Sequence, residues 1–202
     1  MINFDDFDKI LIGIGESCEL ENDREMDFLD KLGRILEGRD YFIVNLCRDD
    51  FIYKTAINEN KIVSPCGGYR YFQCVDDCAH ELLPVSEAMR NSDIRPKCPH
   101  CGKEVVYNRL PMENYNEGGY LEQWQEYNKW LQTTINKRLL VLELGVGMKY
   151  PSVIRFPFEK LAMFNKKCHM YRVHPTLAFS TPEIQESCEC VTCDPIEFLL
   201  DL

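Results

Sequence analysis

Short runs of apolar residues, several of them ending in glycine, are the dominant pattern along this chain. The runs at residues 9–15, 41–46 and 137–145 are apolar at most positions. A strand buried on both faces has this composition, because helices cover both sides of a parallel sheet. Shorter runs predict further strands at residues 61–64, 105–108, 167–173 and 190–193.

Between these runs, apolar residues recur with helical spacing. Residues 25–36 and 119–134 place apolar side chains three or four positions apart, so each predicts an amphipathic helix. Shorter helices are predicted at residues 52–57, 156–165 and 195–202. Strands that alternate with helices predict an α/β fold, a Rossmann-like doubly wound parallel sheet.

Two closely spaced cysteine pairs interrupt this alternation: Cys74 with Cys78, and Cys98 with Cys101. Two cysteines on one tight turn reach the same ion, and two such turns complete a tetrahedral zinc site. Four thiolates leave no open position, so we expect a structural zinc. The prediction is a Rossmann-like domain of residues 1–68 and 105–202 with an inserted zinc-ribbon module of residues 69–104.

Two alternatives for metal binding stay open at this point. His80 and His100 flank the quartet, and either could replace one thiolate. A second cysteine-rich stretch holds Cys188, Cys190 and Cys193, but it has no fourth ligand nearby.

Charge and composition narrow the choice of partners. The 202 residues carry a net charge of -10, which argues against binding to nucleic acid or to an anionic membrane surface. No apolar run approaches the roughly 20 residues that span a bilayer. The acidic start lacks the basic region of a signal peptide, and eleven cysteines leave an odd number outside the quartet. We therefore expect a cytoplasmic protein whose partners are other proteins.

Two glycine turns are candidates for binding an anionic ligand. Gly13 and Gly15 are followed by Ser17, and Gly145 is followed closely by Gly147. Backbone N–H groups at such a turn can hold a pyrophosphate. An ordinary strand-to-helix turn has the same sequence, and Glu16 puts a carboxylate where a phosphate would lie.

The order of these parts resembles the sirtuin family of NAD-dependent protein deacylases and ADP-ribosyltransferases, over nearly the whole chain. The segments that carry the resemblance are residues 13–17, 41–49, 65–74, 145–148 and 171–175. The resemblance implies zinc as a structural ion, NAD or ADP-ribose as cofactor, and a protein as substrate. If the turn at Gly13 binds pyrophosphate, we expect Gly15→Glu to abolish ADP-ribose binding and to leave the fold intact.

The resemblance also implies roles for individual residues. The implied cofactor-binding residues are Gly13, Gly15, Ser17, Cys47, Asp49, Gly145, Gly147 and His174. Cys66 stands where the family has a His that acts as general base on a ribose hydroxyl, and a thiol with a pKa near ~8.5 is a different base. Asp49 stands at the carboxamide-anchoring position, which makes Cys66 and Asp49 the candidate catalytic residues.

Each of these residues also has a structural interpretation. Cys47 and Cys66 could be small buried residues, Asp49 could cap a helix, and His174 could lie on the surface. The flexible cofactor loop that follows the first glycine turn in the family is missing here. Two functions remain: an NAD-dependent protein modifier (a deacylase or a mono-ADP-ribosyltransferase), or an inactive zinc-containing module that binds a nucleotide or a protein.

Overall fold

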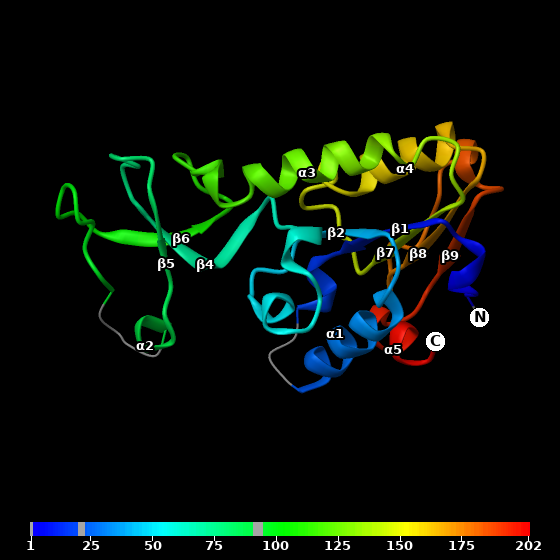
Figure 1. Cartoon of the computed structure of the whole chain (residues 1–202), viewed down its shortest axis with the longest axis horizontal. Coiled ribbons are helices and arrows are strands. Elements are labelled where there is room, and N and C mark those ends of the chain that lie inside the picture. Colours follow the sequence, from blue (N-terminus) through cyan, green and yellow to red (C-terminus); the bar gives the residue numbers. More distant parts are fainter. Residues whose placement is uncertain (1, 20–22, 91–94) are drawn as a thin grey trace.

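A six-stranded parallel sheet forms the centre of the computed structural model, which describes residues 2–19, 23–90 and 95–202 (Figure 1). Its strand order is β3-β2-β1-β7-β8-β9. The strands are β1 (Lys9–Ile14), β2 (Tyr41–Asn45), β3 (Ile62–Val63), β7 (Leu139–Leu144), β8 (Cys168–Val173) and β9 (Cys188–Val191). This order confirms the predicted doubly wound sheet. The strands after β1 are added on one side of it and those from β7 onward on the other, so the strand order reverses between β1 and β7. Ligands bind at this position in doubly wound sheets.

Helices cover both faces of the sheet (Figure 1). One face carries α1 (Asp23–Leu36) and α5 (Pro195–Leu200), and the other carries α3 (Leu121–Gln132) and α4 (Arg155–Phe164). In β1, Ile10 and Ile12 belong to the core under α1, whereas Leu11 belongs to the core under α3 and α4. Side chains alternate along a strand, so burial on both faces requires the continuous apolar run. No helix in the described ranges is long and apolar enough to span a membrane.

The predicted elements agree with the structure apart from their ends and one helix. The segment predicted as a helix at residues 52–57 is a 3-10 turn, η3 (Phe51–Lys54). The Thr55 hydroxyl donates to the carbonyl of Ile52 and accepts from the N–H of Ile57, which ends the turn. The other 3-10 helices are η1 (Phe4–Asp6), η2 (Glu16–Cys18), η4 (Glu59–Lys61), η5 (Glu117–Gly119) and η6 (Pro182–Ile184).

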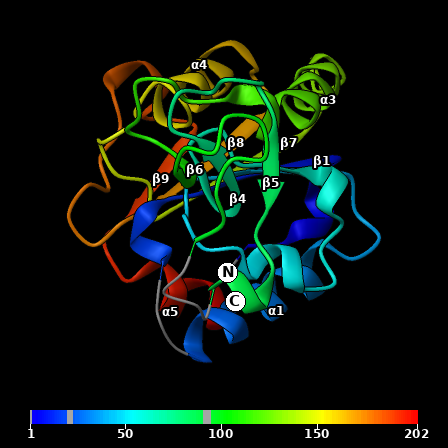
Figure 2. The same ribbon diagram turned by 90° about the vertical axis from the view of Figure 1, so that its left-hand side faces the viewer.

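A smaller antiparallel sheet forms one end of the molecule, and Figure 2 views the molecule from that end. Its strands are β4 (Gly67–Cys74), β5 (Leu82–Pro84) and β6 (Val105–Arg109), in the order β5-β4-β6. A short helix, α2 (Glu87–Arg90), follows β5. The polar stretch at residues 79–97 predicted neither β5 nor α2, because such short exposed elements show no apolar period. Residues 91–94 of that stretch lie outside the described residues.

Candidate functional site

The predicted ligand residues converge at the carboxyl ends of the parallel strands. The N–H of Gly15 donates to the carbonyl of Leu144 at 2.8 Å, which joins the turn after β1 to the end of β7. The N–H of Gly145 donates to the carbonyl of Val173 at 2.8 Å, which joins β7 to β8. The Cys47 thiol, just after β2, lies 3.4 Å from the carbonyl of Gly15, so the end of β2 also contacts the turn after β1.

The turns after β1 and β7 lie in direct backbone contact. A Cβ atom on Gly15 would lie 2.2 Å from the carbonyl oxygen of Gly145, so no side chain fits there. Gly145 has a φ of +63°, which favours glycine. The expectation that Gly15→Glu leaves the fold intact is therefore wrong. Gly13 has a packing role, because its missing Cβ leaves room for Phe158 of α4 and for Ile154, which precedes that helix.

The carboxylate of Glu16 lies between the two turns. Its Oε2 atom accepts a hydrogen bond from the N–H of Gly147 at 3.1 Å. The other oxygen, Oε1, is buried and has no hydrogen-bond partner within the described residues. A carboxylate oxygen is an anionic acceptor like a phosphate oxygen, so it stands in for one here. The turns therefore fit an anion, provided that Glu16 rotates away.

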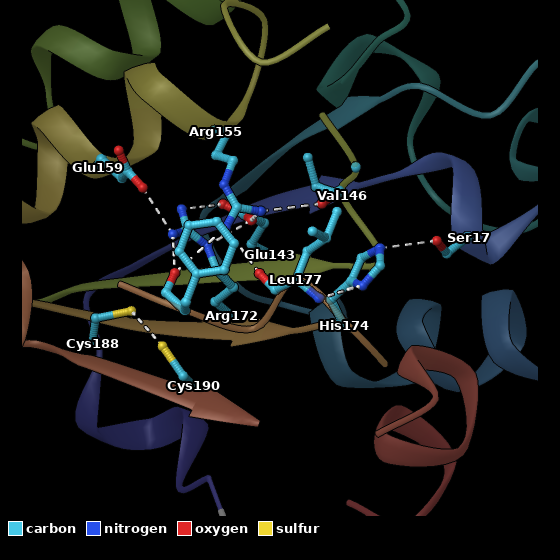
Figure 3. Close-up of polar contacts among 12 residues, drawn as sticks. Ser17, Glu143, Val146, Arg155, Glu159, Arg172, His174, Leu177, Cys188 and Cys190 are labelled. Carbon is cyan, nitrogen blue, oxygen red and sulfur yellow. Dashed lines mark hydrogen bonds and ion pairs between the residues drawn. The ribbon is translucent and has the colours of Figure 1, made fainter. Parts of the chain in front are cut away.

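His174 lies at the end of β8 and holds a defined tautomer (Figure 3). Its Nδ1 accepts from the N–H groups of Thr176 and Leu177 at 3.1 and 3.0 Å, so Nε2 carries the proton of the neutral ring. Nε2 then donates to the Ser17 hydroxyl at 3.3 Å. Burial is the main cause of a lowered pKa at His174, and the positive charge of Arg155 lowers it further. The ring is therefore neutral at pH 7. His174 is 7% exposed, which excludes the surface interpretation.

A buried ion network underlies this edge of the sheet, and sequence reasoning missed it (Figure 3). The carboxylate of Glu143 binds the guanidinium of Arg172 through two hydrogen bonds, of 2.8 and 3.0 Å. Arg155 lies 3.6 Å from the same carboxylate and donates to the carbonyl of Leu177 at 2.9 Å. The network therefore positions the loop that fixes His174. A glutamate within an otherwise apolar strand was the available signal.

The residues predicted for the nicotinamide side are buried or half-buried. Burial, and then the negative charge of Glu16, raise the pKa of the Cys66 thiol to about 12, so it is protonated at pH 7. Asp49 Oδ1 accepts from the N–H of Phe51, the first residue of η3, at 3.0 Å, whereas the N-cap position of η3 belongs to Asp50. Cys47 and Asp49 line a small cavity together with Ser64.

A buried amide supports the loop that carries Cys47 and Asp49. Asn45 is 2% exposed and was missed in the sequence. Its side-chain nitrogen donates to the carbonyl of Cys47 and to the hydroxyl of Ser64, and its oxygen accepts from the N–H of Cys47. The Ser64 hydroxyl also lies 2.8 Å from that of Tyr53. These bonds hold the loop against the end of β3.

The four predicted zinc ligands meet at the end of the smaller sheet. Their sulfur atoms all lie within 4.8 Å of one another. The sulfurs of Cys74 and Cys101 are 3.5 Å apart, and those of Cys78 and Cys98 are 3.6 Å apart. A tetrahedral zinc with bonds of about 2.3 Å separates its sulfur ligands by about 3.8 Å. The donor set therefore fits zinc.

The alternative metal ligands do not join a site. His80 pairs with Asp77, and His100 pairs with Glu81 at 2.8 Å, so both are held outside the quartet. The sulfurs of Cys188 and Cys190 lie 4.0 Å apart. In the described part of the chain, the quartet alone brings three or more ligand atoms within reach of one ion.

Two curated proteins show similarity in sequence, whereas no family model matches the chain. One is a probable bifunctional ADP-ribose hydrolase/ADP-ribosyltransferase of Fusarium oxysporum f. sp. cubense, 28% identical over 62% of this chain and 24% of that protein. The other is a protein ADP-ribosyltransferase of Staphylococcus aureus (strain Mu50 / ATCC 700699), 22% identical over 77% of this chain and 53% of that protein. The chain thus spans about a quarter and about half the length of these relatives.

Solved sirtuin structures share the fold. A structure from work on sirtuin substrate affinity superposes with a TM-score of 0.58 at 14% identity, over 95% of this chain and 90% of that chain. A structure of Sir2Tm bound to a propionylated peptide also has a TM-score of 0.58, at 15% identity, over 95% and 89% of the two chains. The predicted sirtuin-like architecture, a Rossmann-like sheet with a four-cysteine module, is confirmed.

Proposed function

We propose that this chain binds NAD at the carboxyl edge of the parallel sheet and transfers ADP-ribose to a protein. The observation that carries this proposal is the contact between two glycine turns, where the N–H of Gly147 already holds a carboxylate oxygen. Two further findings support it. A neighbour in fold is a Sir2 complex with a p53 peptide and NAD+, and both curated relatives are named as ADP-ribosyltransferases.

The state of Cys66 favours ADP-ribosyl transfer over deacylation. Deacylation needs a general base on a ribose hydroxyl, and a thiol with a pKa of about 12 is a poor base at pH 7. In ADP-ribosyl transfer, the bond from ribose to nicotinamide breaks, and nicotinamide leaves with the bonding electrons. A nucleophile of the partner protein bonds to the ribose carbon and releases its proton to solvent. This transfer requires no base at Cys66.

The remaining site residues take binding roles in this proposal. The amide groups near Gly147 hold the pyrophosphate once Glu16 has rotated away. Ser17 and His174 face the ribose, and Asp49 binds the carboxamide. We place the activity in the cytoplasm, because the eleven cysteines leave an odd number outside the quartet, which disfavours a disulfide framework.

A second function, nucleotide binding without chemistry, is favoured by two specific observations. Cys66 is protonated, and the carboxylate of Glu16 lies where the phosphates are proposed to bind. Such a protein would bind ADP-ribose and release no nicotinamide from NAD. The zinc module and the sheet do not distinguish the two functions, because a fold alone does not determine activity.

Calorimetric titration of the zinc-loaded protein with NAD and with ADP-ribose tests the proposal. Mass spectrometry of the same mixtures then measures free nicotinamide and any ADP-ribosylated protein. Binding of both ligands with release of nicotinamide supports transfer. Binding of both ligands without release supports the second function. If neither ligand binds, both proposals fail.

A further inference from the structure

A groove lined by basic side chains lies between β6 and the turn that follows β7. It has a volume of about 340 Å³. Its four cations are Arg48, Arg95, Arg109 and Lys149, and the rest of its lining is Val106, Tyr107, Leu110, Pro111 and Met112. Among the residues that the structure describes, no acidic residue lines the groove, although the chain carries 33 acidic and 23 basic residues. Cations therefore gather here against the charge of the whole molecule.

Aromatic rings, rather than carboxylates, hold two of these cations. The guanidinium of Arg109 donates to the hydroxyl of Tyr69 at 2.9 Å and lies over its ring. The guanidinium of Arg95 lies 5.1 Å from the centre of the Tyr107 ring. Within the described residues, Arg48 is the one groove cation with an ion pair, to Glu19 at 3.1 Å. A ring positions a cation and leaves its charge available to a ligand.

The groove leads to the candidate active site. Leu110, in its wall, donates its N–H to the carbonyl of Cys66 at 2.9 Å. Arg109 pairs with Gly67 across the sheet, directly after Cys66. Lys149 follows Gly147 by two residues, so it lies on the turn proposed to hold the pyrophosphate. A segment bound in the groove would therefore lie beside the reacting groups.

We propose that this groove binds an acidic segment of the partner protein and so selects the substrate by charge. The inference rests on the proposed function only in calling the partner a substrate. A protein segment is favoured over nucleic acid because the groove is short and the rest of the chain is acidic. A long polyanion that extended beyond the groove would meet a repulsive surface.

Fluorescence anisotropy without NAD tests the proposal. The probe is a labelled short peptide of alternating Glu and Gly, compared with a peptide in which Gln replaces every Glu. We expect the Glu peptide to bind and the Gln peptide to bind much more weakly. The double variant R109Q/K149Q should lose about tenfold in affinity for the Glu peptide. The matched control is K160Q/K166Q, which neutralises two exposed lysines away from the groove and should bind as the parent does.

Three outcomes would overturn the proposal. The two peptides bind the parent equally, the groove variant keeps the parent's affinity, or a single-stranded oligonucleotide binds more tightly and depends on the same two cations. The last outcome would assign the groove to nucleic acid. Zinc content and thermal unfolding show that each variant is folded. Because NAD is absent, failure here leaves the nucleotide proposal intact, and failure of nucleotide binding leaves the groove proposal intact.

Discussion

Glu16 determines whether the glycine turns can accept a ligand. Its carboxylate holds the N–H of Gly147, and its negative charge would repel a pyrophosphate at the same place. Glu16→Gln removes the charge and keeps a similar shape. We expect calorimetry to show an affinity for ADP-ribose about tenfold above that of the parent, the effect of about 1.4 kcal/mol.

The control for this variant is Glu186→Gln, which neutralises an exposed carboxylate elsewhere on the molecule. It should bind ADP-ribose with the parent's affinity. An equal gain in both variants would show that net charge, rather than the position of Glu16, governs binding. An unchanged affinity in Glu16→Gln would remove Glu16 from the proposed site.

Gly15 is required by the contact between the two turns rather than by a ligand. Gly15→Ala places a methyl group 2.2 Å from the Gly145 carbonyl, and the backbone must shift. We expect a loss of about 1–3 kcal/mol in the free energy of unfolding, measured by urea denaturation. The matched control is Gly33→Ala in α1. Its added methyl group lies 3.5 Å from the side chain of Ile57, which is an ordinary van der Waals distance. Equal stability of Gly15→Ala and the parent would contradict the described contact.

The buried ion network joins the neighbouring strands β7 and β8 through the side chains of Glu143 and Arg172. Burial alone would lower the pKa of Arg172, but the hydrogen bonds that its guanidinium donates to Glu143 and Glu159 raise it. Glu143→Gln leaves two buried guanidinium groups without their shared carboxylate. We expect it to lower the free energy of unfolding by about 3–5 kcal/mol in urea denaturation.

The control is Glu189→Gln on β9, which removes a carboxylate that lies near the surface at 2.8 Å from the ring of His169. Exposed pairs contribute about 0–1 kcal/mol, so this variant should remain close to the parent. If both variants lower the free energy of unfolding by the same small amount, the ion network has no special role in stability.

The stability of the zinc module can be tested by removing one cysteine of the quartet. Cys98→Ser removes one ligand from the quartet, and zinc binding is coupled to folding at such sites. We expect loss of bound zinc, measured by elemental mass spectrometry, and a clear drop in the melting temperature. Cys193→Ser, which changes a thiol outside the quartet, should keep both values. A Cys98→Ser protein that melts like the parent would not hold a structural zinc.

The sequence predicts most helices and strands because buried positions in them carry apolar residues. The parallel strands are visible since their residues are apolar on both faces, and the zinc ligands are visible since their spacing is local. The link from Glu143 to Arg172 is different, because it depends on the register that pairs these residues across β7 and β8. The contact of Glu16 with Gly147 likewise joins two turns far apart in sequence. Such contacts follow from the assembled sheet, and no local pattern specifies them.

At the scale of the whole molecule, charge is distributed unevenly. The chain carries a net charge of -10, yet its basic groove lies beside the candidate active site. The neutral His174 and the protonated Cys66 add no charge at that site near pH 7. An acidic partner would therefore be attracted by the cations of the groove and repelled by the net negative charge of the chain as a whole. This arrangement favours one docking position.

An ion pair at Asp50 links the zinc module to the domain of the parallel sheet. The carboxylate of Asp50, after β2, binds the guanidinium of Arg90 in α2 at 2.8 and 2.6 Å and lies 3.1 Å from the amine of Lys54. Burial alone would raise the pKa of Asp50, but these hydrogen bonds lower it below the usual value of 3.8. The ionised carboxylate is therefore stabilised in the folded state.

The direction of this shift sets the pH dependence. A lowered pKa in the folded state adds stability above the unfolded pKa of about 4, and that stability is lost as the pH falls through the folded pKa. Thermal unfolding between about pH 6 and pH 2 should therefore show a steeper acid decline in the parent than in Asp50→Asn. Asp30→Asn, at an exposed position in α1, should follow the parent. If Asp50→Asn declines as steeply as the parent, other carboxylates determine acid stability, and the link between the module and the sheet does not depend on this charge.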